Sequence, residues 1–168
     1  MAVVQENAAS DARSQESEPP LSALAEEFAA REREAVARRL AALDALAPTR
    51  DRWRARSRYY HESVERLIRF VVPSGASVLD VGCATGDLLD ALRPGRGVGL
   101  DISPAMVEIA RAKYPKLEFV VGDVLDLRLD EKFDYIILSD VVGLLDDVGS
   151  ALRALHRVSH PDTRVVIT

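Results

Sequence analysis

The residues best suited to chemistry lie in the stretch Val78–Gly86, which reads VLDVGCATG. An apolar run carries the carboxylate Asp80 near its end, and two glycines, Gly82 and Gly86, follow four positions apart. Glycines in a turn let backbone N–H groups come close to a ligand where a side chain would block them. The stretch is therefore typical of a buried strand that opens into the binding turn of a nucleotide-like cofactor.

Three further carboxylates follow apolar runs downstream of this turn: Asp101, Asp123 and Asp140, the last preceded by Ser139. Asp101 comes 19 residues after Gly82, close to the spacing of about 20 residues at which an acid binds ribose hydroxyls. A carboxylate suits a diol because it accepts hydrogen bonds from both O–H groups. If these acids follow parallel strands, they line one crevice beyond the strand ends.

The elements that must position these residues alternate between apolar runs and helical patterns. The runs predict strands over Val78–Val81, Gly97–Asp101, Leu117–Val121, Phe133–Leu138 and Arg164–Thr168. The patterns predict helices over Asp87–Leu92, Pro104–Tyr114 and roughly Gly149–Val158. Such alternation indicates an α/β fold with a Rossmann-like, doubly wound and mostly parallel sheet. Because nothing follows the last apolar run to cover its edge, we expect a fragment that is truncated after the fifth strand.

The N-terminal part of the chain follows a different pattern. Residues 1–20 lack apolar periodicity and predict a disordered tail. Residues 21–72 predict a helical segment, with one amphipathic helix that Pro48 ends and a second over about Asp51–Val71. The apolar stripe of the first helix favours a packing or homodimer face. Residues 73–168 then form the cofactor domain.

Composition excludes several classes of function. The net charge is −5, and residues 73–168 carry 10 basic and 15 acidic side chains, whereas binding to nucleic acid needs clustered Lys and Arg. No apolar run approaches the about 20 residues of a membrane-spanning helix, and residues 1–20 lack the apolar core of a secretory signal. The single cysteine, Cys83, excludes an internal disulfide and a thiolate metal cluster. We therefore expect a cytoplasmic protein without a metal site.

Four segments occur together in a characteristic order: VLDVGCATG at 78–86, GVGLDIS at 97–103, LEFVVGDVLDL at 117–127 and FDYIILSDVVGLLDD at 133–147. In this order and spacing they resemble class I S-adenosylmethionine-dependent methyltransferases, over residues 77–168. The sequence departs from the family's pattern at Ala84, where a glycine is usual. Alanine is tolerable there if its φ angle is negative.

The resemblance implies that the methionine part of S-adenosylmethionine lies at the glycine turn. Gly82, Cys83 and Gly86 would wrap it, and Asp80 would fix the turn and the amino group. Ser139 would lie close to the transferable methyl group. The cationic sulfonium of this cofactor also suits the acidic crevice.

The resemblance likewise assigns the adenosine contacts. Asp101 would bind the ribose hydroxyls, and Ile102 would pack on the adenine. Asp123 would accept a hydrogen bond from the adenine amino group, with the Val124 N–H beside it.

No general base is secure in the sequence. Asp140 is the best-placed candidate by chain position, and Tyr60 and His61 could reach over the site from the preceding helix. Such a base is needed only if the acceptor must lose a proton.

Alternative interpretations stay open. The glycines could serve a plain turn, Asp101 could cap a helix that Ser103 caps better, and Cys83 is more simply a packing residue. The arginines at alternate positions from 50 to 58 could bind an anionic surface, although a solvated helix face is the simpler interpretation. The alternatives to a methyltransferase are a non-catalytic interaction module and a nicotinamide-dependent oxidoreductase. The acceptor could be a small molecule, a glycan or a lipid, and a fused downstream domain could follow.

Overall fold

The computed structural model describes residues 20–168, so the predicted disordered tail lies almost wholly outside the described residues. The chain divides into two compact units, residues 1–36 and 37–168. Helix α1 (Leu21–Leu46) contributes to both units. Within the first unit, Arg31 pairs with Glu27 one helical turn away at 2.6 Å. The predicted division between helical segment and cofactor domain near residue 72 stays a prediction.

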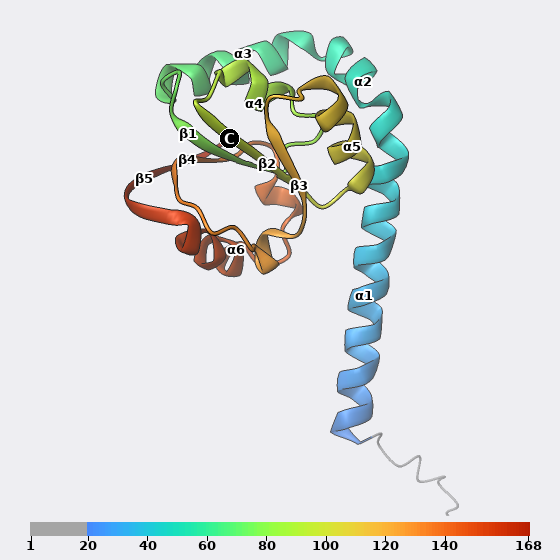
Figure 1. Ribbon diagram of the computed structural model, residues 1–168. Helices are drawn as coiled ribbons and strands as arrows, with labels where there is room; N and C mark the ends of the chain where they lie inside the picture. The colour runs from blue at the N-terminus through green and yellow to red at the C-terminus, as the bar shows by residue number, and fades with distance from the viewer. Residues whose placement is uncertain (1–19) are drawn as a thin grey trace, which may run out of the picture. The chain divides into compact units, whose positions relative to one another are not determined.

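The second unit is built on one five-stranded sheet, and all its strand pairs are parallel. Its strands are β1 (Ser77–Val81), β2 (Arg96–Asp101), β3 (Glu118–Val121), β4 (Phe133–Leu138) and β5 (Ser159–Ile167). They lie in the order β3-β2-β1-β4-β5 (Figure 1). The order reverses between β1 and β4, and ligands of such sheets bind at this switch point. The predicted Rossmann-like fold is confirmed.

Helices cover both faces of the sheet. Helices α3 (Arg58–Val71), α4 (Asp87–Leu92) and α5 (Pro104–Lys113) bury Ile68, Leu89 and Val107 against one face. Helix α6 (Val148–Leu155) buries Leu155 against the other face, where it lies apart from α3, α4 and α5 (Figure 1). Strands covered on both faces need continuous apolar runs, which is why the sequence pattern located them.

The second predicted helix is in fact two helices. Helix α2 (Arg50–Arg56) ends at Ser57, whose φ of −101° and ψ of 29° leave helical geometry, and α3 begins at Arg58. Helix α1 ends at Leu46 as expected, but a 3-10 turn over Ala47–Thr49 joins it to α2. Pro48 is compatible with this turn because it lies at the start, where its missing N–H is not needed.

Strand β5 also begins earlier than predicted. Regular pairing with β4 starts at Arg164, opposite Tyr135, as the apolar pattern indicates. The structure adds a bulged start from Ser159, which lies opposite Phe133. The bulge fits Pro161, which cannot donate to a regular ladder. Within residues 20–168, no helix combines the length and the apolar character needed to cross a membrane.

Candidate functional site

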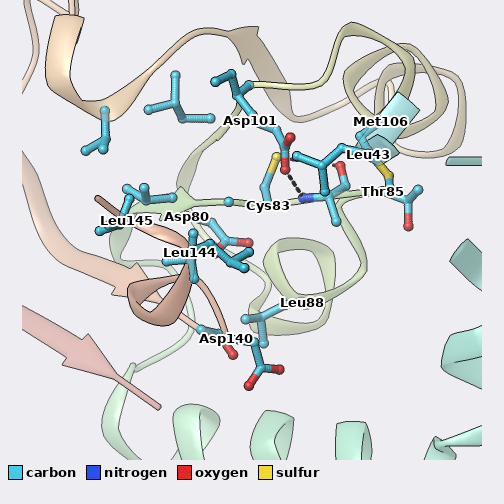
Figure 2. Close-up of a pocket in the computed structure, with 18 of the residues that line it drawn as sticks. Leu43, Asp80, Cys83, Thr85, Leu88, Asp101, Met106, Asp140, Leu144 and Leu145 are labelled. Carbon is cyan, nitrogen blue, oxygen red and sulfur yellow. Dashed lines mark hydrogen bonds between the residues drawn. The ribbon is translucent and has the colours of Figure 1, made fainter. Parts of the chain in front are cut away.

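The carboxyl ends of four strands open into one cavity of about 560 Å³. Apart from Gly86, it is lined by every predicted cofactor contact: Asp80, Gly82, Cys83, Asp101, Ile102, Asp123, Val124 and Ser139. Asp140 and His61 line it too, whereas Tyr60 does not. Figure 2 shows the carboxylates of this cavity among apolar side chains such as Leu88, Leu144 and Leu145. Parallel strand ends bring these residues together, as the sequence predicted.

The glycine turn after β1 uses its own N–H groups within the protein. Gly82 and Cys83 both donate to the Leu100 carbonyl, at 2.7 and 3.1 Å. The Ala84 N–H donates to Asp101 Oδ2 at 2.8 Å, the bond drawn in Figure 2. These N–H groups are therefore paired within the protein, and the expected role of the turn around the cofactor stays a prediction. The turn gives the cavity a backbone wall that its own contacts hold in place.

Ala84 itself occupies left-handed backbone, with a φ of 47°. The condition under which alanine would be tolerated at no cost, a negative φ, is not met. An L-residue pays about 1–2 kcal/mol in this region because its Cβ approaches the following carbonyl. The site therefore contains a strained residue beside the Asp101 contact.

Gly86 serves the fold and does not line the cavity. Its φ is 82°, and a Cβ there would lie 2.7 Å from the Phe119 ring and 3.1 Å from the Tyr114 ring. Glycine is thus required because strand β1 must turn into α4 against these two rings. Its expected place around the methionine part of the cofactor stays a prediction.

Asp80 is the most unusual group in the site. The residue is 2% exposed, and its Oδ2 atom has no hydrogen-bond partner among the described residues. Burial, together with the neighbouring charge of Asp101, raises its pKa to about 7. A buried carboxylate without a partner is costly, and a cation that lies against it removes that cost. The site therefore fits a cofactor with a positively charged group.

Asp101 is held firmly at the end of β2. Its Oδ2 accepts from Ala84, and its Oδ1 accepts from the Ser103 N–H at 2.9 Å. Burial raises its pKa, against the effect of these two bonds and of Arg50. Since each carboxylate oxygen has two lone pairs, acceptor capacity for a diol is left. Ser103 caps α5 through Met106, as predicted.

Asp123 and Val124 begin the wall beyond β3. Asp123 Oδ1 accepts from the Leu125 N–H at 2.9 Å and so caps a 3-10 turn over Val124–Asp126. Val124 is buried, whereas Asp123 is exposed. Asp123 therefore caps a turn and lines the cavity at the same time.

The end of β4 brings the candidate base groups together. Asp140 has a φ of 56°, and its Oδ1 accepts from the Tyr60 hydroxyl at 2.5 Å. This bond raises the pKa of Tyr60. The His61 ring meets the Tyr60 ring edge-on at 5.2 Å, and burial and the charges of Arg54 and Arg50 lower the pKa of His61.

Two neighbours complete this end of the site. Ser139 exchanges a hydrogen bond with Thr168 at 3.0 Å. The Val141 side chain lies so close to Gly82 that a Cβ there would meet it at 2.7 Å. The loop after β4 therefore packs directly on the glycine turn.

A polar network that the sequence did not reveal ties α2 to the glycine turn. Thr85 Oγ1 donates to Asp51 or Asp87, at 2.8 and 2.9 Å. Lys113 Nζ donates to the same two carboxylates at 2.8 Å, and Tyr114 donates to Asp87 at 2.7 Å. Burial alone would raise the pKa of Asp87, but the bonds from Lys113, Tyr114 and Thr85 lower it overall.

The arginines of residues 50–58 divide between two environments. Arg50 and Arg54 are half-buried and line the cavity, whereas Arg52, Arg56 and Arg58 are exposed. The interpretation of the whole series as a solvated face was therefore wrong for two of its members. Their i, i+4 spacing was a usable signal, but the break at Ser57 hid which face turns inward.

The turn lacks the features that bind a diphosphate. Its N–H groups at 82, 83 and 84 are used internally, and α4 has only six residues and begins with the carboxylate Asp87. Both features disfavour the nicotinamide alternative, because dinucleotide sites place a pyrophosphate on free N–H groups at a helix start. Across residues 20–168, no three His, Cys, Asp or Glu side chains are grouped to hold a metal ion.

Comparison with known proteins agrees with this geometry. Residues 79–167 match the family described as a methyltransferase domain. A solved structure of similar fold is a TehB-like S-adenosylmethionine-dependent methyltransferase from Corynebacterium glutamicum. It is 30% identical at a TM-score of 0.57, and the match covers 70% of each chain.

Two curated relatives act on different molecules by their names. A 2-phytyl-1,4-naphthoquinone methyltransferase of Thermosynechococcus vestitus is 36% identical, over 57% of this chain and 47% of the relative. A dTDP-4-amino-2,3,4,6-tetradeoxy-D-glucose N,N-dimethyltransferase of Saccharopolyspora spinosa is 34% identical, over 62% of this chain and 44% of the relative. The chain thus spans about half the length of these relatives.

Proposed function

This chain belongs to the methyltransferase domain family of class I, S-adenosylmethionine-dependent enzymes, and we propose that it binds S-adenosylmethionine and transfers the methyl group to a small-molecule acceptor. The observation that carries the proposal is the pair of carboxylates at the switch point, one buried and one half-buried. Asp80 has an unpartnered oxygen suited to a cation, and Asp101 is fixed by two backbone bonds with acceptor capacity left.

We assign the cofactor contacts along the cavity from β1 to β3. Asp80, beside Gly82 and Cys83, would bind the amino group of the methionine part. Asp101 would accept from the ribose hydroxyls. The adenine would lie against apolar side chains of the β2 and β3 ends, Ile102 and Val124, within reach of Asp123.

When bound, the cofactor supplies a methyl group on a sulfonium, which leaves by in-line displacement. The chain's contribution is then to exclude water and to align the acceptor, which can supply much of the rate. Ser139 and Asp140, at the end of β4, lie at the switch point where the acceptor would enter. The apolar lining around them, Leu88, Leu144 and Leu145, favours an acceptor with an apolar part.

For an acceptor that must lose a proton, we propose Asp140 or His61 as the base. His61 lines the cavity with a lowered pKa, so it is neutral near pH 7 and able to accept a proton. Tyr60 would hold Asp140 in position through its 2.5 Å hydrogen bond. The relatives that act on a quinone and on an amino sugar suggest the first acceptors to try, and a cytoplasmic setting stays our prediction.

Cofactor choice is tested by binding, with the fluorescence of Trp53 as the readout, since this only tryptophan lines the cavity. We expect saturable binding of S-adenosylhomocysteine and none of NAD. Asp101→Asn should weaken binding at least tenfold, whereas Asp126→Asn, at an exposed position, should not change it. Binding of NAD alone, or unchanged affinity in Asp101→Asn, would count against the proposal.

Catalysis needs a separate experiment. Transfer of a radiolabelled methyl group from S-adenosylmethionine to a demethylated quinol or an aminodeoxy sugar nucleotide would support an enzyme. Tight S-adenosylhomocysteine binding without transfer to any acceptor would favour the non-catalytic interaction module.

A further inference from the structure

We propose that Arg50 and Arg54 form a carboxylate-binding subsite in the wall of the cavity. The two side chains lie one helical turn apart on α2 and both line the cavity. The remaining arginines of this series point to solvent, so the inward pair is set by the helix face and not by composition.

The donors of these two guanidinium groups are largely unused. Within the described part of the chain, neither makes a hydrogen bond, and Arg50 has no ion pair. Arg54 lies 3.5 Å from Glu65 and 3.9 Å from Asp87. Asp87 is already engaged by Lys113 and Tyr114, so it compensates Arg54 only in part.

The third arginine of the cavity gives an internal comparison. Arg39 is already paired, because it donates twice to Asp146, at 2.9 Å for each bond, and once to the Leu144 carbonyl at 3.2 Å. A planar fork of donors in a half-buried wall matches a carboxylate bidentately. Arg50 and Arg54 have this bidentate capacity left, whereas the two terminal nitrogens of Arg39 already hold Asp146.

The carboxylate can come from two sources. One is the amino-acid part of the cofactor, since Arg54 lies beside Asp87 at the end of the glycine turn. The other is an acidic group on the acceptor. The first source rests on the proposed function, whereas the second requires only that the cavity binds an organic acid.

The first experiment compares two ligands that differ by one group. S-adenosylhomocysteine carries the carboxylate, and 5′-deoxy-5′-(3-aminopropylthio)adenosine keeps the amine and lacks it. Affinities are measured by calorimetry for wild type, Arg50→Gln, Arg54→Gln and the matched control Arg52→Gln, whose side chain is exposed on the same helix. Loss of a charged hydrogen bond corresponds to about a 10- to 100-fold loss of affinity.

If the cofactor supplies the carboxylate, Arg50→Gln and Arg54→Gln lose about 10- to 100-fold for S-adenosylhomocysteine and keep their affinity for the decarboxylated ligand. Wild type then also binds S-adenosylhomocysteine more tightly than the decarboxylated ligand, and added salt reduces this difference in affinity. This comparison in wild type shows whether the carboxylate is recognised even if a variant fails to fold, which circular dichroism would detect. Unchanged affinity for S-adenosylhomocysteine in both folded variants would show that other residues recognise it.

If the acceptor supplies the carboxylate, the variants keep the wild-type affinity for S-adenosylhomocysteine. The protein loaded with S-adenosylhomocysteine then binds benzoate but not neutral benzamide. Arg50→Gln then loses benzoate binding, and Arg52→Gln keeps it. Equal affinities for both adenosine ligands, together with no preference for benzoate, overturn the subsite. If wild type binds neither adenosine ligand, the proposed function fails, and benzoate against benzamide on the free protein still tests the subsite.

Discussion

Three residues around the glycine turn adopt states that residues of their type usually avoid. Asp80 is buried without a partner for one oxygen. Ala84 and Asp140 have φ angles of 47° and 56°. Backbone strain and buried charge persist only where the surrounding structure holds them, and they cluster at functional sites. These three residues therefore indicate the same cavity that the strand topology indicates.

Replacing Ala84 by glycine should stabilise the protein. Glycine removes the Cβ strain of left-handed backbone and keeps the N–H bond to Asp101. The free energy gained in this way exceeds the entropic cost of ordering a glycine, which has more conformational freedom in the unfolded chain. We expect a gain of about 0.5–1 kcal/mol in the free energy of unfolding, measured by urea titration. Ala91→Gly, within helix α4, should instead lose about 1 kcal/mol. A destabilising Ala84→Gly would contradict the strain at this position.

At the scale of elements, the sequence predicted the helices and strands whose positions are controlled by local residue patterns. The βαβ units were located because doubly covered strands need apolar runs, and their carboxyl ends brought Asp80, Asp101 and Asp140 to one cavity. The network of Asp51 with Thr85 and the inward turn of Arg50 escaped prediction. They depend on how the short helix α2, which ends before Ser57, packs against the glycine turn, and the i, i+4 spacing of Arg50 and Arg54 alone does not show which face turns inward.

Helix α3 should owe its position to one buried side chain. Ile68 is fully buried against the sheet, whereas its neighbour Leu67 is 60% exposed. We expect Ile68→Ala to cost about 2–4 kcal/mol in the free energy of unfolding and Leu67→Ala less than about 0.5 kcal/mol. Because α3 carries Tyr60 and His61, the effect of this packing on ligand binding is best measured in the milder variant Ile68→Val. Equal costs for the two alanine variants would show that α3 does not pack as described.

For the molecule as a whole, seven of the 15 acidic side chains of residues 73–168 line the cavity. At the switch point Asp80 is buried and Asp101 is half-buried, and burial raises the pKa of each. The free protein therefore bears a cost of ionisation that a cationic ligand would relieve. Global stability and ligand binding are linked through the same carboxylates.

This linkage predicts how stability depends on pH. Between about pH 4 and pH 7 the folded protein keeps a proton on Asp80 that the unfolded chain releases, so ionisation of Asp80 lowers stability as pH rises through this window. Asp80→Asn cannot ionise. Its free energy of unfolding, relative to wild type, should therefore rise by about 2–4 kcal/mol between pH 4 and pH 8. Urea titrations at both pH values measure this, and the exposed Asp90→Asn serves as the control.

Saturating S-adenosylhomocysteine should reduce the pH dependence of wild type, because its ammonium group favours the ionised Asp80. A constant difference between Asp80→Asn and wild type would show that Asp80 is already compensated in the free protein, and it would remove the main argument for a cation at this position.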